Sequence, residues 1–137
     1  QAEQAFADYS LRSARKLARS TFYGMGRWQG GLEKKQSFLG RIVDIGAELY
    51  GISCACVYAQ TLATEDSANA AQYVELADLF CAQARRRADR LFHELWFNDD
   101  ADNYSAARRV LDGRYTAFER DLLDPAGEGP LLPHAQG

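Results

Sequence analysis

The chain has 137 residues, of which 47% are hydrophobic and 26% are charged, and its formal net charge is -3. A chain of this length predicts a single domain, large enough to bury a core without help from a disulfide or a metal. The small negative charge gives no overall attraction to nucleic acid or to an anionic membrane, so we expect no nucleic-acid partner.

The three cysteines, Cys54, Cys56 and Cys81, stand in apolar surroundings. An odd number of cysteines favours reduced, buried thiols in a cytoplasmic protein over a disulfide framework. The sequence has no run of 18 apolar residues, so we expect no membrane-spanning helix, and we find no signal peptide. The chain begins at Gln1 rather than Met, which suggests a fragment or a processed product.

The first predicted helix covers residues 2 to 28. Its inward residues recur at helical spacing and comprise Phe6, Ser10, Ala14, Leu17, Thr21 and Trp28. The glycines at 24, 26, 30 and 31 supply the conformational freedom of a turn, so segment 22–31 is expected to end this helix. A phosphate-binding loop is a weaker interpretation, because no strand precedes these glycines and their spacing does not fit a dinucleotide fingerprint.

A long second helix is predicted from Gly30 to Thr64, a stretch without proline. At about 1.5 Å per residue it would span roughly 50 Å. Its expected inward stripe is wide enough to touch two or more neighbours and comprises Leu32, Phe38, Leu39, Ile42, Val43, Leu49, Tyr50, Ser53, Cys56 and Val57. From residue 49 onward the helix carries no charge, so a fourth helix or another domain must cover its outer side. That outer side is expected to comprise Gly51, Ala55, Tyr58, Ala59 and Leu62.

Glycines inside this second helix are costly unless a neighbour uses the space that they leave. Gly40 and Gly51 are eleven residues apart, which is three helical turns, so the two share a face. Their position predicts the close approach of another helix or domain.

The third predicted helix runs from about Ala68 to Phe97, with Asp66 or Ser67 as its N-cap. Its seam alternates spacings of three and four residues and comprises Val74, Ala77, Cys81, Ala84, Ala88, Leu91 and Leu95. Such a seam favours a shallow antiparallel crossing, and its small central residues let a partner backbone come close.

A shorter fourth helix is expected from about Tyr104, with a bend or break at Gly113. Residues 125–137 hold two of the three prolines and predict a disordered, flexible tail, which leaves residues 1–124 as the helical domain. No segment shows a convincing strand pattern or a repeat. The sequence therefore predicts an all-α fold, an up-and-down four-helix bundle with a long second helix and a disordered C-terminal tail.

No pattern in the sequence assembles a metal or catalytic site. Neither histidine, His93 or His134, stands three residues after a glutamate, as a di-iron bundle requires, and His93-Glu94 does not continue into a zinc motif. Nothing supplies the third group or the oxyanion hole that a cysteine nucleophile beside His93 would need. We therefore predict no catalytic, cofactor-binding or metal-ligating residue in this chain.

Residues 12–35 are strongly basic, with only Glu33 against Arg12, Arg15, Lys16, Arg19, Arg27, Lys34 and Lys35. Aromatic residues at 22, 23 and 28 are interleaved with them. Two interpretations stay open: a surface for phosphates or an anionic membrane, and a solvated face balanced by the acidic stretch 99–128. The arginines at 85, 86, 87 and 90 have Asp89 and Glu94 within helical reach and predict a solvated face.

Three segments resemble the extra C-terminal helical domain of larger acyl-CoA dehydrogenases, the very-long-chain type and its bacterial relatives. They are residues 14–23 (ARKLARSTFY), residues 35–50 (KQSFLGRIVDIGAELY), and residues 77–81 (ADLFC) followed by 84–87 (ARRR). The resemblance extends from about Ala14 to Leu123. It is a family-level pattern of helices and not an active-site signature.

The resemblance implies that this chain is the C-terminal structural or assembly domain of an FAD-dependent oxidoreductase. Such a flavoprotein desaturates fatty acyl-CoA between Cα and Cβ in fatty acid β-oxidation. In that family a glutamate removes the α-proton, FAD accepts the β-hydride, and an electron-transferring flavoprotein takes the electrons. The catalytic domains are absent here, so no FAD-binding or catalytic residue is carried onto this chain. Glu48 is not the base, and no activity is expected from the fragment alone.

The resemblance also implies partners. In the very-long-chain enzymes the extra domain packs on the dehydrogenase core and is linked to dimer organisation and membrane association, which would account for the uncharged second half of the long helix. We therefore expect a cytoplasmic homo-oligomer that packs on the core of its own chain, with attachment to the membrane periphery as an option. The alternative is a stand-alone helical interaction module that tethers to a membrane surface through residues 12–35.

Overall fold

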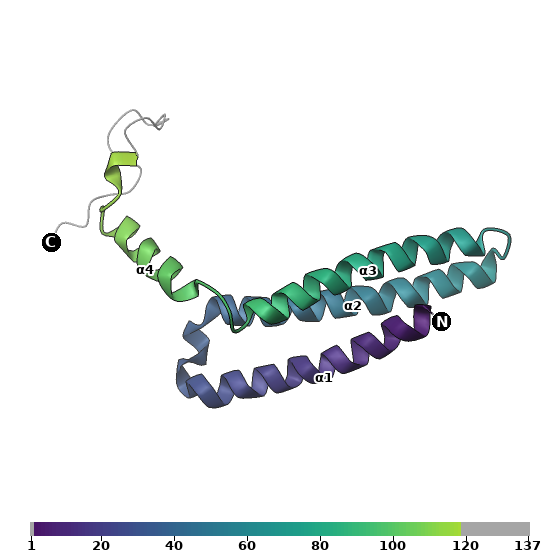
Figure 1. Ribbon diagram of the computed structural model, residues 1–137, viewed down its shortest axis with the longest axis horizontal. Coiled ribbons are helices and arrows are strands. Elements are labelled where there is room, and N and C mark those ends of the chain that lie inside the picture. The colour runs from purple at the N-terminus through teal and green to yellow at the C-terminus, as the bar shows by residue number, and fades with distance from the viewer. Residues whose placement is uncertain (1, 119–137) are drawn as a thin grey trace. The chain divides into compact units, whose positions relative to one another are not determined.

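The computed structural model describes residues 2–118, and these residues contain helices and no strand (Figure 1). The elements are α1 (Ala2–Trp28), the 3-10 helix η1 (Gln29–Lys34), α2 (Gln36–Glu65), α3 (Ala70–Glu94), α4 (Asp100–Leu111) and the 3-10 helix η2 (Thr116–Phe118). This order of four α-helices confirms the predicted all-α helical bundle. The predicted tail at 125–137 and the domain limit at residue 124 lie outside the described residues.

The chain divides into two compact units, Gln1–Phe97 and Asn98–Gly137. The first unit holds α1, α2 and α3, and the second holds α4. In the first unit α2 and α3 lie side by side as an antiparallel hairpin, and α1 runs alongside them (Figure 1). Because α2 makes the most extensive contacts with the other two helices, it forms the centre of this unit.

The seam predicted for α3 is confirmed in its central part. Cys81, Ala84 and Ala88 are fully buried, and Leu95 exposes only 2% of its surface. Small side chains at these positions let α3 lie close against α2, and this helix pair holds most of the core.

The inward face of α2 differs in part from the predicted stripe. Phe38 and Leu49 are buried as predicted, but the fully buried Ile45 and Ile52 were missing from that stripe. Three of its members are instead largely exposed, namely Val43, Tyr50 and Val57. Hydrophobic residues surround this helix on nearly all sides, so spacing alone left its rotation undetermined. Contact with the small residues of α3 determines which apolar residues face inward.

The turn between α1 and α2 falls later than the glycines predict. Gly24 and Gly26 lie inside α1, and α2 begins at Gln36 because residues 29–34 form η1. Gly24 provides space for a neighbouring side chain, since a Cβ added there would lie 2.7 Å from the ring of Phe38. The turn itself uses Gln29, which has a φ of 46°.

The close approach predicted at the glycines of α2 occurs at one of them. A Cβ added to Gly51 would lie 3.4 Å from the Phe80 ring of α3, whereas one added to Gly40 would meet no described atom within 4 Å. Ala59, which was expected on the outer side, is buried, while Tyr58 is 65% exposed as expected.

The turn between α2 and α3 is built around Asp66 without the predicted capping bond. The N-cap of α3 is Asn69, and its side chain makes no capping hydrogen bond. The Asp66 carboxylate instead accepts hydrogen bonds from Asn69 Nδ2 at 2.8 Å and from the Tyr73 hydroxyl at 2.9 Å. These two bonds lower the pKa of Asp66, because they favour its charged form.

In the second unit α4 begins at Asp100, four residues before the expected start, and ends at Leu111. The break predicted at Gly113 is confirmed, since this residue has a φ of 77°. Its amide donates to the Val110 carbonyl at 3.0 Å, and the Arg114 amide donates to the Arg109 carbonyl at 2.9 Å. This pattern is a left-handed C-terminal cap, for which glycine is favoured.

Candidate interaction surface

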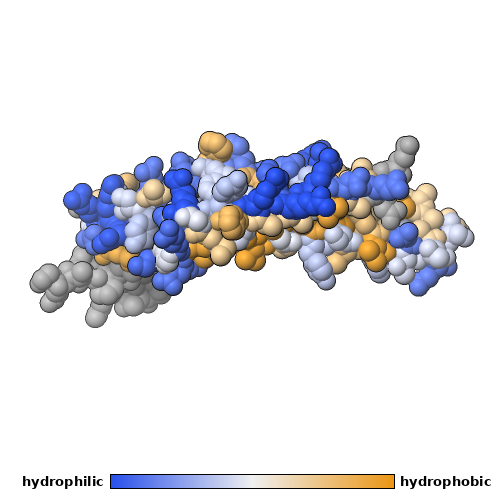
Figure 2. All heavy atoms as spheres, turned by 90° about the horizontal axis from the view of Figure 1, so that it is seen from below, coloured by the Kyte–Doolittle hydropathy of each residue, from blue (hydrophilic) through white to orange (hydrophobic). Residues whose placement is uncertain are grey.

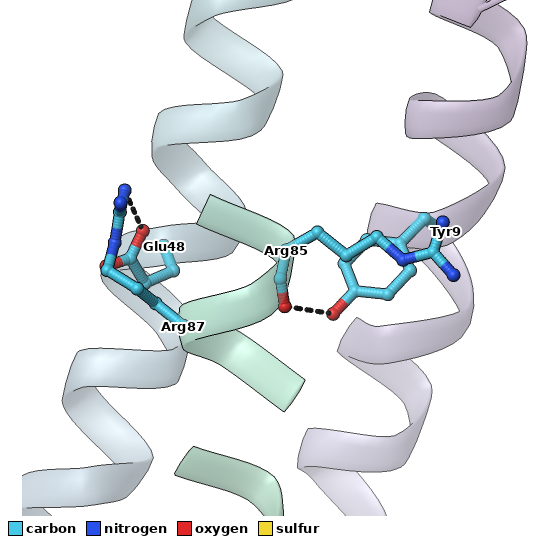
Figure 3. A network of polar contacts seen from close by, with 4 residues as sticks. All are labelled: Tyr9, Glu48, Arg85 and Arg87. Carbon is cyan, nitrogen blue, oxygen red and sulfur yellow. Dashed lines mark hydrogen bonds and ion pairs between the residues drawn. The ribbon is translucent and has the colours of Figure 1, made fainter. Parts of the chain in front are cut away.

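Polar contacts join the three helices of the first unit (Figure 3). The Tyr9 hydroxyl of α1 donates to the Asp89 carboxylate at 2.7 Å and lies 3.4 Å from the carbonyl oxygen of Arg85, both on α3. On the other side of α3, Arg87 donates to both carboxylate oxygens of Glu48 on α2, at 2.6 and 3.0 Å. Glu48 therefore serves as an interhelical partner of Arg87.

The Tyr9 phenol is shielded from water in this network. Burial, followed by its hydrogen bond to Asp89, raises the pKa of Tyr9 to about 12. The phenol is therefore neutral at physiological pH and acts as a hydrogen-bond donor that holds α1 against α3.

The solvated face predicted for the arginines of α3 is largely confirmed. Arg85 lies 3.8 Å from Asp89, and Arg90 lies 3.7 Å from Glu94, each across one helical turn. Arg87 is the exception, because it reaches across to α2. Exposed pairs of this kind contribute little to stability, with a median below about 1 kcal/mol.

The described residues hold no group of three or more His, Cys, Asp or Glu side chains that could bind a metal. His93 is exposed and stacks on Phe97 with ring centres 4.9 Å apart. Cys56 and Cys81 have their sulfur atoms 3.8 Å apart, and burial raises the pKa of Cys81 to about 12. Such a thiol is a poor nucleophile. Cys54 is exposed, contrary to the expectation of three buried thiols.

Within the basic segment 12–35, Lys16 and three of the arginines lie in different surroundings. Lys16 lies over the Phe92 ring, with Nζ 4.3 Å from the ring centre. In contrast, Arg12, Arg15 and Arg19 are exposed and, with Ala18, line a shallow depression on α1. Among the described residues none of these three arginines forms an ion pair. We call Arg12, Arg15 and Arg19 the arginine stripe.

A shallow groove runs between α1 and α2. It is lined by Ala7, Ser10, Leu11 and Ala14 from α1 and by Leu49, Tyr50 and Ser53 from α2. We call these seven residues the α1–α2 groove. Leu11 is 55% exposed and Tyr50 is 73% exposed, so apolar surface borders the groove on both helices.

The groove continues onto the outer side of α2, where no charged residue occurs from 49 to 64. Exposed residues on this outer side comprise Val43, Tyr50, Cys54, Val57 and Tyr58. Figure 2 shows hydrophobic surface as a band beside hydrophilic surface on the face seen from below. Large exposed apolar patches of this kind mark sites of interaction with proteins or membranes.

By length and composition α2 could cross a membrane, and it is the one helix among the described residues that meets these criteria. Only 22% of its most apolar stretch is buried among the described residues. The sequence predicts no helix that could span a membrane when only unbroken runs of apolar residues are counted. That criterion misses α2, in which polar residues interrupt the apolar ones. A mostly buried core helix of a soluble protein meets the same criteria, whereas α2 packs against α1 and α3 and still leaves most of its apolar stretch exposed.

The described residues thus form a helical protein with exposed apolar side chains along α2, and they hold no group of side chains that could bind a metal. Over 122 residues, 88% of its length, the chain is 57% identical to the "Probable acyl-CoA dehydrogenase FadE10" of Mycobacterium bovis. Proteins of the same name from two strains of Mycobacterium tuberculosis match equally well.

The match covers only 19% of each of these relatives and lies in their C-terminal part. The chain therefore spans about a fifth of the length of the proteins that it matches. No family model and no solved structure matches the chain. The predicted resemblance to the C-terminal part of an acyl-CoA dehydrogenase is confirmed at the level of sequence.

Proposed function

We propose that this chain is the C-terminal structural and assembly domain of an FAD-dependent acyl-CoA dehydrogenase whose catalytic residues lie outside it. The observation that carries this proposal is that the chain is 57% identical to a segment covering about a fifth of the length of proteins named as probable acyl-CoA dehydrogenases. Fatty acyl-CoA as substrate, a role in β-oxidation, a cytoplasmic location and a homo-oligomeric state are parts of the same proposal.

The exposed outer side of α2 supports an assembly role. Tyr50 and Val57 stand on a helix that already contacts two neighbours, and both are more than 60% exposed. Covering such residues with a further protein surface is favourable, by roughly 25 cal/mol per Å² of apolar area. In the proposed protein, the dehydrogenase core supplies that cover.

The described residues do not fit a flavin site. The α1–α2 groove and the depression at the arginine stripe are both shallow, and the glycines at 24 and 26 lie inside a helix without a preceding strand. A flavin dinucleotide needs a deep pocket with a backbone cradle for its phosphates. We therefore assign no step of the flavin chemistry to this chain.

The proposal is tested by flavin absorbance on two polypeptides: residues 1–137 alone, and the full product of the reading frame that contains them. We expect stoichiometric flavin and acyl-CoA dehydrogenase activity only in the full product. Stoichiometric flavin on residues 1–137, or a reading frame that encodes no further dehydrogenase domain, would contradict the proposal.

A second candidate is a stand-alone module that tethers to an anionic membrane surface. It is favoured by the arginine stripe, which lies on the same helix as the exposed Leu11 and Phe22. Co-sedimentation with anionic vesicles tests it: binding that is lost when Arg12, Arg15 and Arg19 are changed to Glu would support the tether. Absence of binding by the unmodified chain would exclude it.

A further inference from the structure

We propose that the α1–α2 groove holds an amphipathic helix with acidic residues along one edge, supplied by the dehydrogenase part of the same longer polypeptide. The identity of the supplier rests on the proposed function. The kind of occupant follows from the shape and charge of the groove itself.

The shape of the groove suits a helix. Its lining includes the small residues Ala7, Ser10 and Ala14 on α1 and Ser53 on α2. Small residues let a third helix approach two others closely, at the usual interaxial distance of about 8–10 Å. The groove is shallow and follows two long helices, which suits an elongated occupant better than a small molecule.

The borders of the groove require an apolar occupant. Leu11 of α1 and Tyr50 of α2, which line the groove, are 55% and 73% exposed. Beyond its two ends, Phe22 of α1 and Val57 of α2 are 73% and 64% exposed. These side chains recur at helical spacing along both helices. A partner helix with apolar residues at positions i, i+3, i+4 and i+7 would cover them along its length.

The charge around the groove is asymmetric. Successive residues of a helix are rotated by about 100° around its axis. Relative to Leu11 of α1, Arg15 is rotated by about 40° and Arg19 by about 80° in the same direction, away from the groove. Ala14 is rotated by about 60° in the opposite direction, toward the groove. The α2 side has no charged residue from 49 to 64. Asp8 is exposed and lies about 60° from Leu11 on the same side as the arginines, so this edge carries both signs with a net positive charge. A docked helix would therefore meet net positive charge along its α1 edge and no charge along its α2 edge, which favours aspartate or glutamate on the α1 side.

A helix from the same polypeptide is the occupant best supported. The chain matches only 19% of its relatives' length, so about four-fifths of such a protein lies outside it. Tethering in one polypeptide raises the effective concentration of a partner, so a shallow groove can be filled without high intrinsic affinity.

Thiol labelling of the gene product that contains this chain tests occupancy. Ala14→Cys places a reporter in the groove, the exposed native Cys54 reports on the outer side of α2, and Arg86→Cys on α3 is the matched control. We expect Ala14→Cys to react about tenfold more slowly in the full gene product than in residues 1–137, with Arg86→Cys unchanged. Equal rates at Ala14→Cys in the two polypeptides would overturn the proposal.

The acidic edge is tested by charge reversal in the same gene product. Changing Arg12, Arg15 and Arg19 to Glu should restore fast labelling at Ala14→Cys, whereas changing them to Lys should preserve the protection. Protection that survives the change to Glu would overturn the acidic edge.

Four further outcomes separate this inference from its competitors. Protection that arises only with added anionic vesicles assigns the groove to lipid, and protection that depends on protein concentration assigns it to a second copy; each overturns the inference. Protection without dehydrogenase activity overturns the proposed function and the identity of the supplier, but supports the groove and the kind of helix that it holds. Activity without protection overturns the inference alone.

Discussion

Gly24 shows how one residue takes its role from a distant part of the chain. It lies within α1, and its missing side chain leaves room for the ring of Phe38 at the start of α2. That ring is held in place by Trp28 and Trp96, with ring centres 4.7 and 5.5 Å away. Phe38 therefore cannot easily move aside, and the space at Gly24 is a requirement of packing.

We expect Gly24→Ala to destabilise the protein. The overpacking cost of about 1–3 kcal/mol exceeds the gain in helix propensity of about 1 kcal/mol. Gly26→Ala is the control, since a Cβ there meets nothing within 4 Å, and it should stabilise the protein by up to about 1 kcal/mol. Urea unfolding of both variants measures the difference, and equal effects would contradict the packing role of Gly24.

Tyr9 makes stability depend on pH in the alkaline range. Its pKa is raised from 10.0 to about 12 in the folded protein, so the folded state keeps a proton that the unfolded state loses. The contribution of Tyr9 is fully present below pH 10 and is lost as the pH rises towards 12. We expect Tyr9→Phe to flatten the fall in unfolding free energy across this window, measured by urea unfolding at successive pH values. An unchanged slope would show that the phenol is not shielded.

At the scale of elements, the α2–α3 hairpin is the most tightly specified part of the protein. The seam of Cys81, Ala84 and Ala88 has no exposed surface, and the paired Ile45 and Ile52 are equally buried. The Arg87–Glu48 pair adds an interhelical contact, but its side chains are 40% and 21% exposed, so its contribution is modest. Apolar packing therefore provides most of the stability of this pair of helices.

Enlarging the seam should separate the two helices. We expect Ala84→Leu to lower the free energy of unfolding by about 1–3 kcal/mol, because the added carbons have no space between α2 and α3. Gln83→Leu, one position away and exposed, should change it by no more than about 0.5 kcal/mol. Thermal unfolding of the two variants makes the comparison, and a neutral Ala84→Leu would contradict the close approach.

At the scale of the whole molecule, the described helices leave a group of apolar side chains exposed to solvent. The outer side of α2 leaves Val43, Tyr50, Val57 and Tyr58 more than half exposed. Single exposed apolar residues are common, but a continuous group bordering a groove is characteristic of an interface. This surface, rather than any cluster of reactive groups, is the feature on which the proposed assembly role depends.

Residues 1–137 in isolation should therefore bind a hydrophobic fluorescent dye in the native state. Tyr50→Lys combined with Val57→Lys should reduce the dye fluorescence several-fold, because two charges interrupt the apolar surface. Arg86→Lys on α3 is the control and should leave it unchanged. Dye fluorescence that is equal in all three proteins would show that the outer side of α2 is not the binding surface.

The sequence by itself determined the elements: four helices in order, the α3 seam, the break at Gly113 and the charge-free second half of α2. Local spacing, glycine conformation and composition suffice for these features. The rotation of α2, the role of Gly24 and the exposure of Tyr50 were decided by tertiary structure. A helix that is apolar on nearly every side has no unique inward face until its neighbours occupy part of it, and the small seam of α3 and the basic, amphipathic α1 together leave one apolar side of α2 uncovered.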